Sequence, residues 1–326
     1  MINLRQYRIL SFFLTRSLFL GGCFSLLVNI SKNSMIISGI IGMLLGYFLL
    51  YLVYKCKGKL CKFIKVIICL VILLISTLSS TMLTSNYLLS KTPTLLILLF
   101  FYGLLMYGKS KNLDVIGRIS EIIVIISLLI YVLGYIGILK SINISNMLPI
   151  MNSSFINVIK GIIIFMGASL LPNILLINEC NEYKFKDISI GYILGSLSII
   201  VIMFFILTIY GSELSSIARF PEYLILKKIN IMDIVTNLEN VLVMEWIVNI
   251  VICCLFSIKV MYESMNKYLF YVIILMLIVV LEYGIFKDYG IVLMIKNYIY
   301  YICFGLCILS LLFRNKKTTD WQLFLF

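Results

Sequence analysis

The sequence predicts an all-α polytopic membrane protein with about ten transmembrane helices and almost nothing outside the bilayer. Of the 326 residues, 62% are hydrophobic and 13% are charged. In soluble domains about 45–50% of the residues are apolar and about 25% are charged. The mean hydropathy is +1.11. A soluble fold of this length could not bury so much apolar surface, so lipid must cover part of it.

The apolar residues are grouped in long runs, and about 20 such residues cross the hydrocarbon core as a helix. The runs do not alternate as barrel strands do, and backbone groups in lipid must pair within their own segment. We therefore expect one transmembrane domain over residues 1–326, ending in a short cytoplasmic tail at 314–326. The predicted spans are 9–30, 34–54, 64–89, 94–108, 117–139, 155–178, 188–210, 238–262, 268–286 and 293–313.

The first apolar run begins near Ile9 and continues to a spanning length, with Arg16 inside it. We interpret it as the first transmembrane helix rather than a cleaved signal peptide, because no small-residue cleavage site follows. The longest loop, 211–237, separates spans seven and eight. Its apolar stretch predicts one or two helices lying against the outer face.

The net charge is +13, but the basic residues fall in short clusters between apolar runs. This pattern is typical of membrane-flanking anchors, so the bilayer and not nucleic acid is the expected partner. More of the clusters lie on the side of the N-terminus than on the other side. Together with an even number of spans, this bias predicts that both termini are cytoplasmic.

The residue types argue against an enzyme. The chain has no His, which excludes His-based triads and His-ligated metals. It has no P-loop, H-E-x-x-H, G-x-S-x-G or G-x-G-x-x-G motif. The nine Cys lack partner ligands at metal-site spacing. We predict no catalytic residues, no metal and no cofactor.

Two spans carry residues that weaken helices at mid-membrane. Span one contains Thr15-Arg-Ser-Leu-Phe-Leu-Gly-Gly22 and span six contains Gly167-Ala-Ser-Leu-Leu-Pro-Asn173. Glycine and proline interrupt the helix ladder, and unwound backbone at this depth must line a cavity or be buried in protein. Each segment alone fits either a binding site, or a kink or close helix packing through small residues.

Their positions favour the binding site. Spans one and six lead two halves of five helices each, about 9–139 and about 155–313. Five is odd, so the second half must run inverted. We predict a five-plus-five inverted repeat with spans one and six interrupted, and paired interruptions of this kind point to a transporter-type site. The predicted ligand-binding residues are polar or small: Thr15, Ser17, Gly21, Gly22, Ser79, Ser80, Gly167, Ala168, Ser169 and Asn173.

Arg16, Glu121 and Glu245 are the ionisable residues placed deepest in the predicted spans. Charges in lipid are costly and should face the bundle interior or water. A structural ion pair and a ligand or coupling role both remain open for them. Ser79 and Ser80 belong to a polar stripe in span three, for which helix–helix hydrogen bonding and a ligand vestibule are both open interpretations.

Several short motifs, taken in order, resemble a known family. They are Ile2-Asn-Leu-Arg-Gln6, Gly117-Arg-Ile-Ser-Glu121, Asn146-Met-Leu-Pro149, Val158-Ile-Lys-Gly161, Arg219-Phe-Pro-Glu-Tyr223, Ile231-Met-Asp-Ile-Val-Thr-Asn-Leu-Glu239 and Glu245-Trp246. With this order and spacing, the chain resembles the B subunit of spore germinant receptors. These form the endospore germination permease family of the amino acid–polyamine–organocation transporter superfamily.

The resemblance implies an inverted-repeat fold with spans one and six unwound around a central site. It also implies an amino acid or similar small nutrient as ligand, A- and C-type receptor subunits as partners, and a place in the spore inner membrane or cell membrane. Three hypotheses follow: a receptor subunit that binds the nutrient and signals germination, a secondary active transporter for amino acids or amines, and a scaffold subunit without a ligand.

Overall fold

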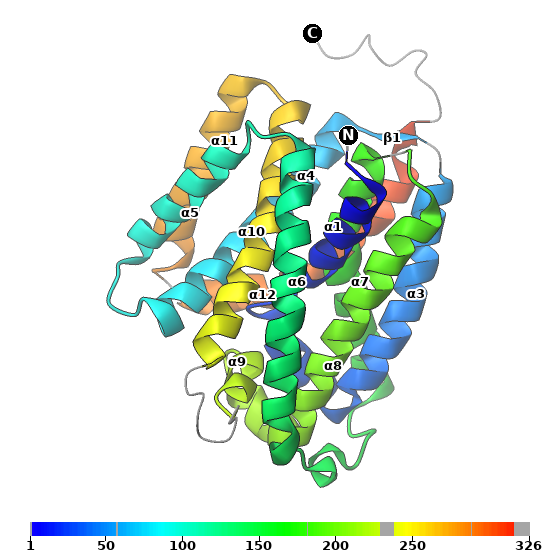
Figure 1. Ribbon diagram of the computed structural model, residues 1–326, viewed down its shortest axis with the longest axis vertical. Coiled ribbons are helices and arrows are strands. Elements are labelled where there is room, and N and C mark those ends of the chain that lie inside the picture. The colour runs from blue at the N-terminus through cyan, green and yellow to red at the C-terminus, as the bar shows by residue number, and fades with distance from the viewer. Residues whose placement is uncertain (1, 57, 181, 229–237, 288, 316–326) are drawn as a thin grey trace.

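A computed structural model describes residues 2–56, 58–180, 182–228, 238–287 and 289–315. These residues form a bundle of helices (Figure 1). The only strands among them are two residues long each: β1 (Lys59–Leu60) pairs antiparallel with β2 (Arg314–Asn315). This pairing joins the loop before α4 to the segment that follows the last helix.

The described residues up to Ile138 form six α-helices. The element bounds are α1 Leu4–Ser17, α2 Cys23–Ser31, the 3-10 turn η1 Lys32–Ser34, α3 Met35–Lys55, α4 Lys62–Leu83, the π-helical turn η2 Thr84–Leu88, α5 Thr94–Gly108 and α6 Leu113–Ile138.

The described residues of the second half also form six α-helices. The bounds are the 3-10 turns η3 Leu139–Ser141 and η4 Ile144–Met147, then α7 Phe155–Glu179, α8 Phe185–Ile217, α9 Pro221–Leu226, α10 Leu238–Ser264, α11 Lys267–Val279, the π-helical turn η5 Val280–Ile285 and α12 Tyr289–Leu312. The short α9 is the helix predicted in the loop 211–237. Residues 229–237 of that loop lie outside the described residues.

Within the described chain, seven helical segments are long and apolar enough to cross a membrane. They are Cys23–Lys55, Lys62–Leu88, Leu113–Ser141, Phe155–Glu179, Phe185–Ile217, Glu239–Ser264 and Lys267–Gly284, with shorter apolar helices at Thr94–Gly108 and Asn297–Leu312. The prediction of an all-α polytopic membrane protein is confirmed. The count of ten spans and the inverted repeat stay predictions.

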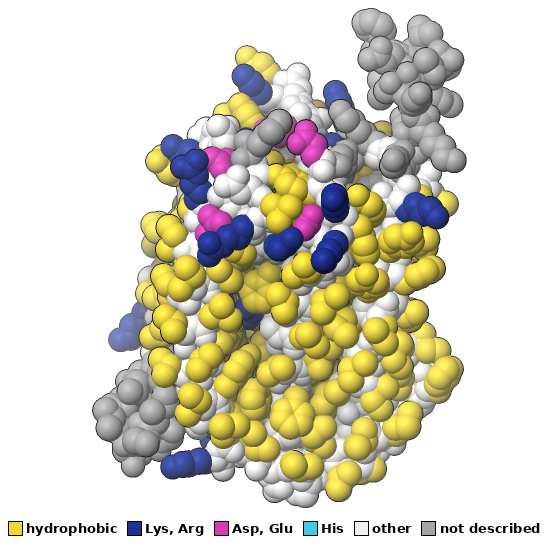
Figure 2. Space-filling view, turned by 45° about the vertical axis from the view of Figure 1, so that its right-hand side comes forward, with side chains coloured by type: hydrophobic (Ala, Val, Ile, Leu, Met, Phe, Trp, Pro, Cys, Tyr) yellow, Lys and Arg dark blue, Asp and Glu magenta, His cyan; other side chains and the backbone are white. Residues whose placement is uncertain are grey.

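The surface is divided between apolar and charged regions. Hydrophobic side chains cover most of the face seen in Figure 2, and charged side chains gather toward the end where the N-terminus lies. Exposed large apolar residues are frequent on α3, α6 and α11, including Phe48, Leu129 and Leu275. Such surface suits contact with lipid rather than with water.

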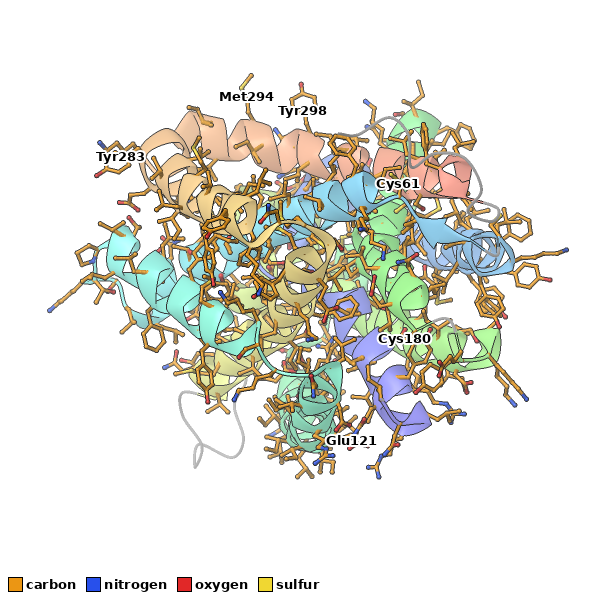
Figure 3. The ribbon with its side chains drawn as sticks, turned by 90° about the horizontal axis from the view of Figure 1, so that it is seen from above. Cys61, Glu121, Cys180, Tyr283, Met294 and Tyr298 are labelled. Carbon is orange, nitrogen blue, oxygen red and sulfur yellow. The ribbon has the colours of Figure 1, made fainter. Side chains whose placement is uncertain are left out.

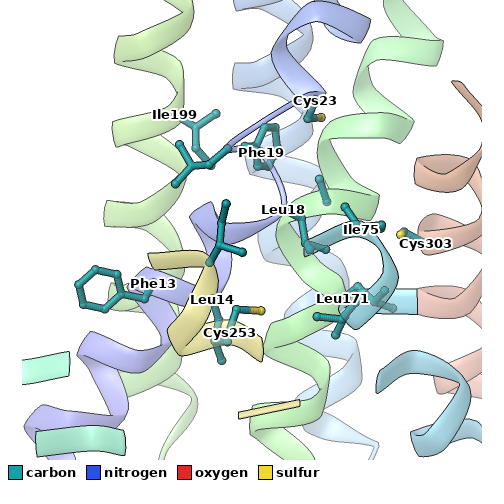
Figure 4. Packing of buried hydrophobic residues seen from close by; sticks show 14 of the residues in the cluster. Phe13, Leu14, Leu18, Phe19, Cys23, Ile75, Leu171, Ile199, Cys253 and Cys303 are labelled. Atoms are coloured by element: carbon teal, nitrogen blue, oxygen red, sulfur yellow. The ribbon is translucent and has the colours of Figure 1, made fainter. Parts of the chain in front are cut away.

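Most residues of α1 and α7 are buried inside the bundle. α1 packs along α8, α10 along α4, and α7 against both α3 and α12. Arg8 of α1 also pairs with Asp187 of α8 at 2.7 Å. A continuous core of buried side chains, including Phe13, Leu171 and Cys253, joins these helices (Figure 4).

Candidate functional site

The first predicted span is interrupted at the expected place. α1 ends at Ser17, α2 begins at Cys23, and residues 18–22 between them are not α-helical (Figure 4). Gly21 has φ 88°, a conformation that glycine adopts readily because it has no Cβ. A Cβ at Gly21 would lie 2.8 Å from Cβ of Ser79. The turn and the close approach of α4 therefore both require glycine here.

The second predicted interruption is wrong. α7 runs as one helix from Phe155 to Glu179, with Pro172 inside it. Proline removes one ladder hydrogen bond, but nearly every residue from Gly161 to Asn178 is buried. Packing against α1, α3 and α12 holds the helix together despite its weak local propensity.

Two side chains satisfy backbone groups that the interruption of span one leaves without helical partners. The carboxylate of Glu222 in α9 accepts a hydrogen bond from the N–H of Gly21 at 3.2 Å. The hydroxyl of Tyr300 in α12 donates to the carbonyl of Leu18 at 3.1 Å. All of these residues are buried. The interrupted segment is thus held from two sides by helices from the second half of the chain.

A small cavity of about 30 Å³ adjoins the interruption. Gly21, Gly22, Ser79 and Tyr300 contribute to its wall, together with apolar residues of α4 and α12. This volume is enough for about one water molecule. In this conformation the space beside the interrupted segment is therefore smaller than an amino acid.

Arg16 and Glu245, two of the three predicted intramembrane charges, belong to one cluster. The guanidinium of Arg16 donates to the hydroxyl of Tyr131, and that hydroxyl donates to the carboxylate of Glu245. Ser127 donates to the other carboxylate oxygen at 2.9 Å. These four side chains, at most 9% exposed, join α1, α6 and α10. The opposite charges offset one another in a region where a lone charge would be strongly destabilising.

Two aromatic rings also contact Arg16. Its guanidinium carbon lies 4.5 Å from the ring centroid of Tyr131 and 5.0 Å from that of Phe12. Both distances are within the range of cation–π attraction. Arg16 is therefore held in α1, just before the interruption, by aromatic and hydrogen-bonding contacts together.

Glu121, the third predicted charge, lies elsewhere. It accepts a hydrogen bond from the amide of Gln6 at 3.2 Å and lies 3.7 Å from Nε of Arg5. Figure 3 shows it at the outer side of α6. Its side chain is 25% exposed, so the structure does not bring Glu121 together with Arg16 and Glu245.

Thr15 and Asn173 contact each other across α1 and α7. The Asn173 amide donates to Thr15 Oγ1 and to the Ser169 carbonyl, both at 2.9 Å, and its oxygen accepts from Ser11 at 2.8 Å. Ser17 donates to the Leu14 carbonyl within its own helix. These polar groups are satisfied by one another, so in this conformation they join two helices.

The three small residues of span six contact protein on all sides. A Cβ at Gly167 would lie 2.4 Å from the carbonyl oxygen of Tyr300, so Gly167 permits close packing of α7 and α12. Ala168 is fully buried. Ser169 donates to the Phe165 carbonyl at 2.8 Å and lies 3.3 Å from the hydroxyl of Tyr192. Close helix packing accounts for this segment.

The two serines of span three differ in their surroundings. Ser79 borders the cavity beside Gly21 and Gly22. Ser80 donates to the Thr77 carbonyl at 3.1 Å within α4. Of the ten predicted ligand-binding residues, the structure thus brings Gly21, Gly22 and Ser79 to one cavity.

Sequence reasoning missed Glu222, Tyr131 and Tyr300. Glu222 lies within the motif Arg219-Phe-Pro-Glu-Tyr223, and an acid in a predicted loop gives no signal of burial, since Glu is mostly exposed. Tyr131 and Tyr300 stand alone in apolar helices, where a tyrosine gives no signal of its partners. The Pro-Glu pair that opens α9 is the one local feature that could have indicated a buried capping acid.

The sequence was compared with models of known protein families. Residues 11–270, well over half of its length, match the family model described as spore germination protein, of the spore permease type. No curated protein matched the sequence. The matched range includes the interrupted first span, α9 and the Arg16–Tyr131–Glu245 cluster. This chain therefore belongs to the spore germination protein family, a family of multi-pass membrane proteins of the receptor and transporter type rather than of enzymes.

Proposed function

We propose that this protein is the membrane subunit of a spore germinant receptor that binds an amino acid or similar small nutrient and signals germination. The observation that carries the proposal is the interruption between α1 and α2, where the Gly21 N–H is held by Glu222 beside a cavity bordered by Ser79. Unwound backbone at membrane depth offers a ligand hydrogen-bonding groups that an intact helix would use internally.

The nutrient acts by shifting a conformational equilibrium. The cavity of about 30 Å³ is too small for an amino acid, so the ligand binds a conformation in which α1 and α2 are further apart. A ligand changes the population of two conformations only through its different affinity for them. The buried hydrogen bonds to Gly21 and Leu18 are the contacts that this opening changes.

The proposed topology has ten spans in a five-plus-five inverted repeat, with both termini cytoplasmic in the spore inner membrane. The helices α5 and α12 supply the shorter apolar spans. The charged end of the bundle, where the N-terminus lies (Figure 2), supports the cytoplasmic placement. A- and C-type receptor subunits are the proposed partners that receive the signal.

Gly21→Ala tests the proposal. At φ 88° a side chain is strained, and the new Cβ would meet Ser79, so we expect loss of the germination response to amino acids. Gly103→Ala is the matched control, because a Cβ at Gly103 meets no atom within 4 Å. Ser79→Ala removes only a hydroxyl and should raise the nutrient concentration that gives half of the maximal response.

The measurements are spore germination against amino acid concentration and the amount of each variant in the membrane. A normal response of Gly21→Ala and Ser79→Ala at wild-type protein levels would place the nutrient elsewhere. If no amino acid changes the thermal stability of the purified wild type, the scaffold hypothesis is favoured, since a ligand that binds the folded state stabilises it.

The buried Arg16–Tyr131–Glu245 cluster favours a second candidate function, a secondary active transporter for amino acids or amines. Intramembrane carboxylates serve as proton-relay groups in transporters. Reconstituted protein distinguishes the two candidates. Saturable uptake driven by a proton or sodium gradient and lost in Glu245→Gln supports transport, whereas binding without uptake supports the receptor.

A further inference from the structure

A large groove lies between α4, α11 and α12. Its volume is about 660 Å³, against about 30 Å³ for the cavity beside the interrupted segment. The helices α4 and α11 belong to segments that are long and apolar enough to cross a membrane, and α12 supplies a shorter apolar helix. The groove therefore lies at the depth of the hydrocarbon region of the bilayer.

The groove is open toward the outside of the bundle. Ile299 of α12 is buried and belongs to its deeper wall, whereas Met276 of α11 and Met294 and Tyr298 of α12 are each at least 60% exposed. Figure 3 shows Met294 and Tyr298 at the edge of the molecule, pointing away from the bundle. Molecules of the surrounding lipid can therefore reach the groove directly.

The walls of the groove are apolar. The described residues that line it are Leu, Ile, Val, Met or Tyr, none of them is charged, and the groove exposes almost no polar surface. Such walls offer a ligand dispersion contacts rather than hydrogen bonds. The two methionines, Met276 and Met294, are flexible enough to adapt to an irregular apolar shape. The ligand that fits these walls is a hydrocarbon.

The shape favours a hydrocarbon chain over a helix of another protein. Transmembrane helices pack through small residues that let their backbones approach, and none of the described lining residues is Gly, Ala, Ser or Thr. Along α12 the groove extends from Met294 to Ile302, about 12 Å at the rise of an α-helix. One leaflet of the hydrocarbon core is about 15 Å thick, so the groove accommodates most of the length of an acyl chain.

We propose that the groove between α4, α11 and α12 binds one acyl chain of a membrane phospholipid. The chain lies along α12 and contacts α4 and α11 on its other sides, while the head group stays at the membrane surface. Because apolar surface has no hydrophobic driving force within a bilayer, the close fit of the chain to the walls supplies the binding energy.

The groove shares a wall with the cavity at the interruption of span one. Ile295 and Ile299 contribute to both spaces, and the next residue, Tyr300, donates its hydrogen bond to the carbonyl of Leu18. The bound chain thus contacts the outer side of a wall whose inner side faces the interrupted segment. Occupancy of the groove stabilises the packing of α12 against α4 that encloses this cavity.

Photo-crosslinking locates the chain. The purified protein is reconstituted in vesicles of phosphatidylcholine and phosphatidylglycerol, a small share of which carries a diazirine at the middle of one acyl chain. Excess detergent removes the bulk lipid before illumination, and mass spectrometry identifies the labelled peptides. The groove residues should carry at least fivefold more label than the face of α6 around Leu129 and Val132, which is exposed but does not line the groove.

Two variants fill the groove from different helices, so that the test does not depend on the folding of one of them. Val71→Trp enlarges a lining side chain of α4, and Ile273→Trp enlarges one of α11. Each should lower the labelling of Met294 and Tyr298 in α12 at least fivefold. The matched control is Val132→Trp at an exposed site on α6, which should retain the labelling of the wild type.

Thermal stability gives a second measurement. Phosphatidylglycerol added back to the delipidated protein in detergent should raise the Tm of the wild type and of Val132→Trp, because a ligand of the folded state stabilises it. The shift should be less than half as large in Val71→Trp and Ile273→Trp.

Three results would overturn the inference. Equal labelling of the groove and of the α6 face would show annular lipid only, and a groove without label after the detergent wash would show that no chain is held there. Undiminished labelling of α12 in both groove-filling variants would place the chain elsewhere. Every readout is taken without nutrient, so the acyl-chain site stands or falls separately from the proposed nutrient site.

Discussion

The carboxylate of Glu222 accepts a hydrogen bond from the N–H of Gly21, a residue 201 positions earlier in the chain. This contact joins the interrupted first span to a six-residue helix between α8 and α10. An acid in a short connecting helix thus supplies the partner that the unwound backbone of another span lacks. The local fold of residues 18–22 depends on a residue from the other half of the protein.

Glu222→Ala should lower the free energy of unfolding by about 1–3 kcal/mol, because it leaves the buried Gly21 N–H without this acceptor. Glu222→Gln should be destabilised less, since its amide oxygen can still accept. Thermal unfolding in detergent measures both, with Glu213→Ala at an exposed site as control. Equal stability of the alanine and glutamine variants would show that this hydrogen bond contributes nothing.

Removing one charge of the Arg16–Glu245 cluster should destabilise the protein more than removing both. Breaking a buried ion pair from one side costs about 3–5 kcal/mol, because the other charge is left uncompensated. Arg16→Met and Glu245→Gln should each show a large loss of stability, and the double variant should show a smaller loss than either single variant. A double-mutant cycle on unfolding free energies measures the coupling. Additive losses would contradict the pairing.

Gly167→Ala should loosen the packing of α7 against α12. Its new Cβ would lie 2.4 Å from the backbone carbonyl oxygen of Tyr300, and backbone moves only with the whole helix. Overpacking of this kind typically costs about 1–3 kcal/mol. Gly103→Ala, where a Cβ meets nothing, should be neutral or slightly stabilising. The comparison of their Tm values separates packing from the general effect of alanine in a helix.

Cys180 should react slowly with maleimide at neutral pH. Burial, and then the nearby carboxylates of Glu179 and Glu182, raise the pKa of its thiol to about 12, and only the thiolate reacts. Its labelling rate in the folded protein should still be rising at pH 10. In the unfolded chain the rate should level off above about pH 8.5. A plateau near that pH in the folded protein would contradict the shift.

The same shift predicts how stability depends on pH at Cys180. The folded state holds this proton more tightly than the unfolded state, so the contribution to stability is complete below about pH 8.5. It is lost as the pH rises from there toward about 12. Cys180→Ser in a denaturation series across this range should reduce the alkaline loss of stability.

Hydropathy was sufficient to predict an all-α polytopic membrane protein, because lipid selects long apolar segments regardless of tertiary detail. It even gave the bounds of α5, Thr94–Gly108. The interruption of span one was also predictable, since two adjacent glycines, Gly21 and Gly22, lie a few residues after the polar run Thr15-Arg-Ser17 within one apolar segment. At this position the local preference of the glycines and the folded structure both give an interrupted helix.

The predicted interruption of span six was wrong because tertiary packing overrides the local chemistry there. Gly167, Pro172 and Asn173 weaken a helix taken alone, but α7 is enclosed by neighbours that hold it intact. A single sequence does not reveal that Gly167 faces the backbone of α12. Nor does it reveal that Tyr131 stands between Arg16 and Glu245, because such contacts are set by helices more than a hundred residues apart.

The first span consists of two helices, α1 and α2, whereas α7 is continuous. The two parts of the bundle therefore differ in how they can move. α7 is one continuous helix, whereas the non-helical residues 18–22 give α1 a point about which it can rotate relative to α2. The far end of α1 carries Arg8, which pairs with Asp187, and Arg5, which lies near Glu121. A rotation of α1 at the glycines would therefore break these ion pairs.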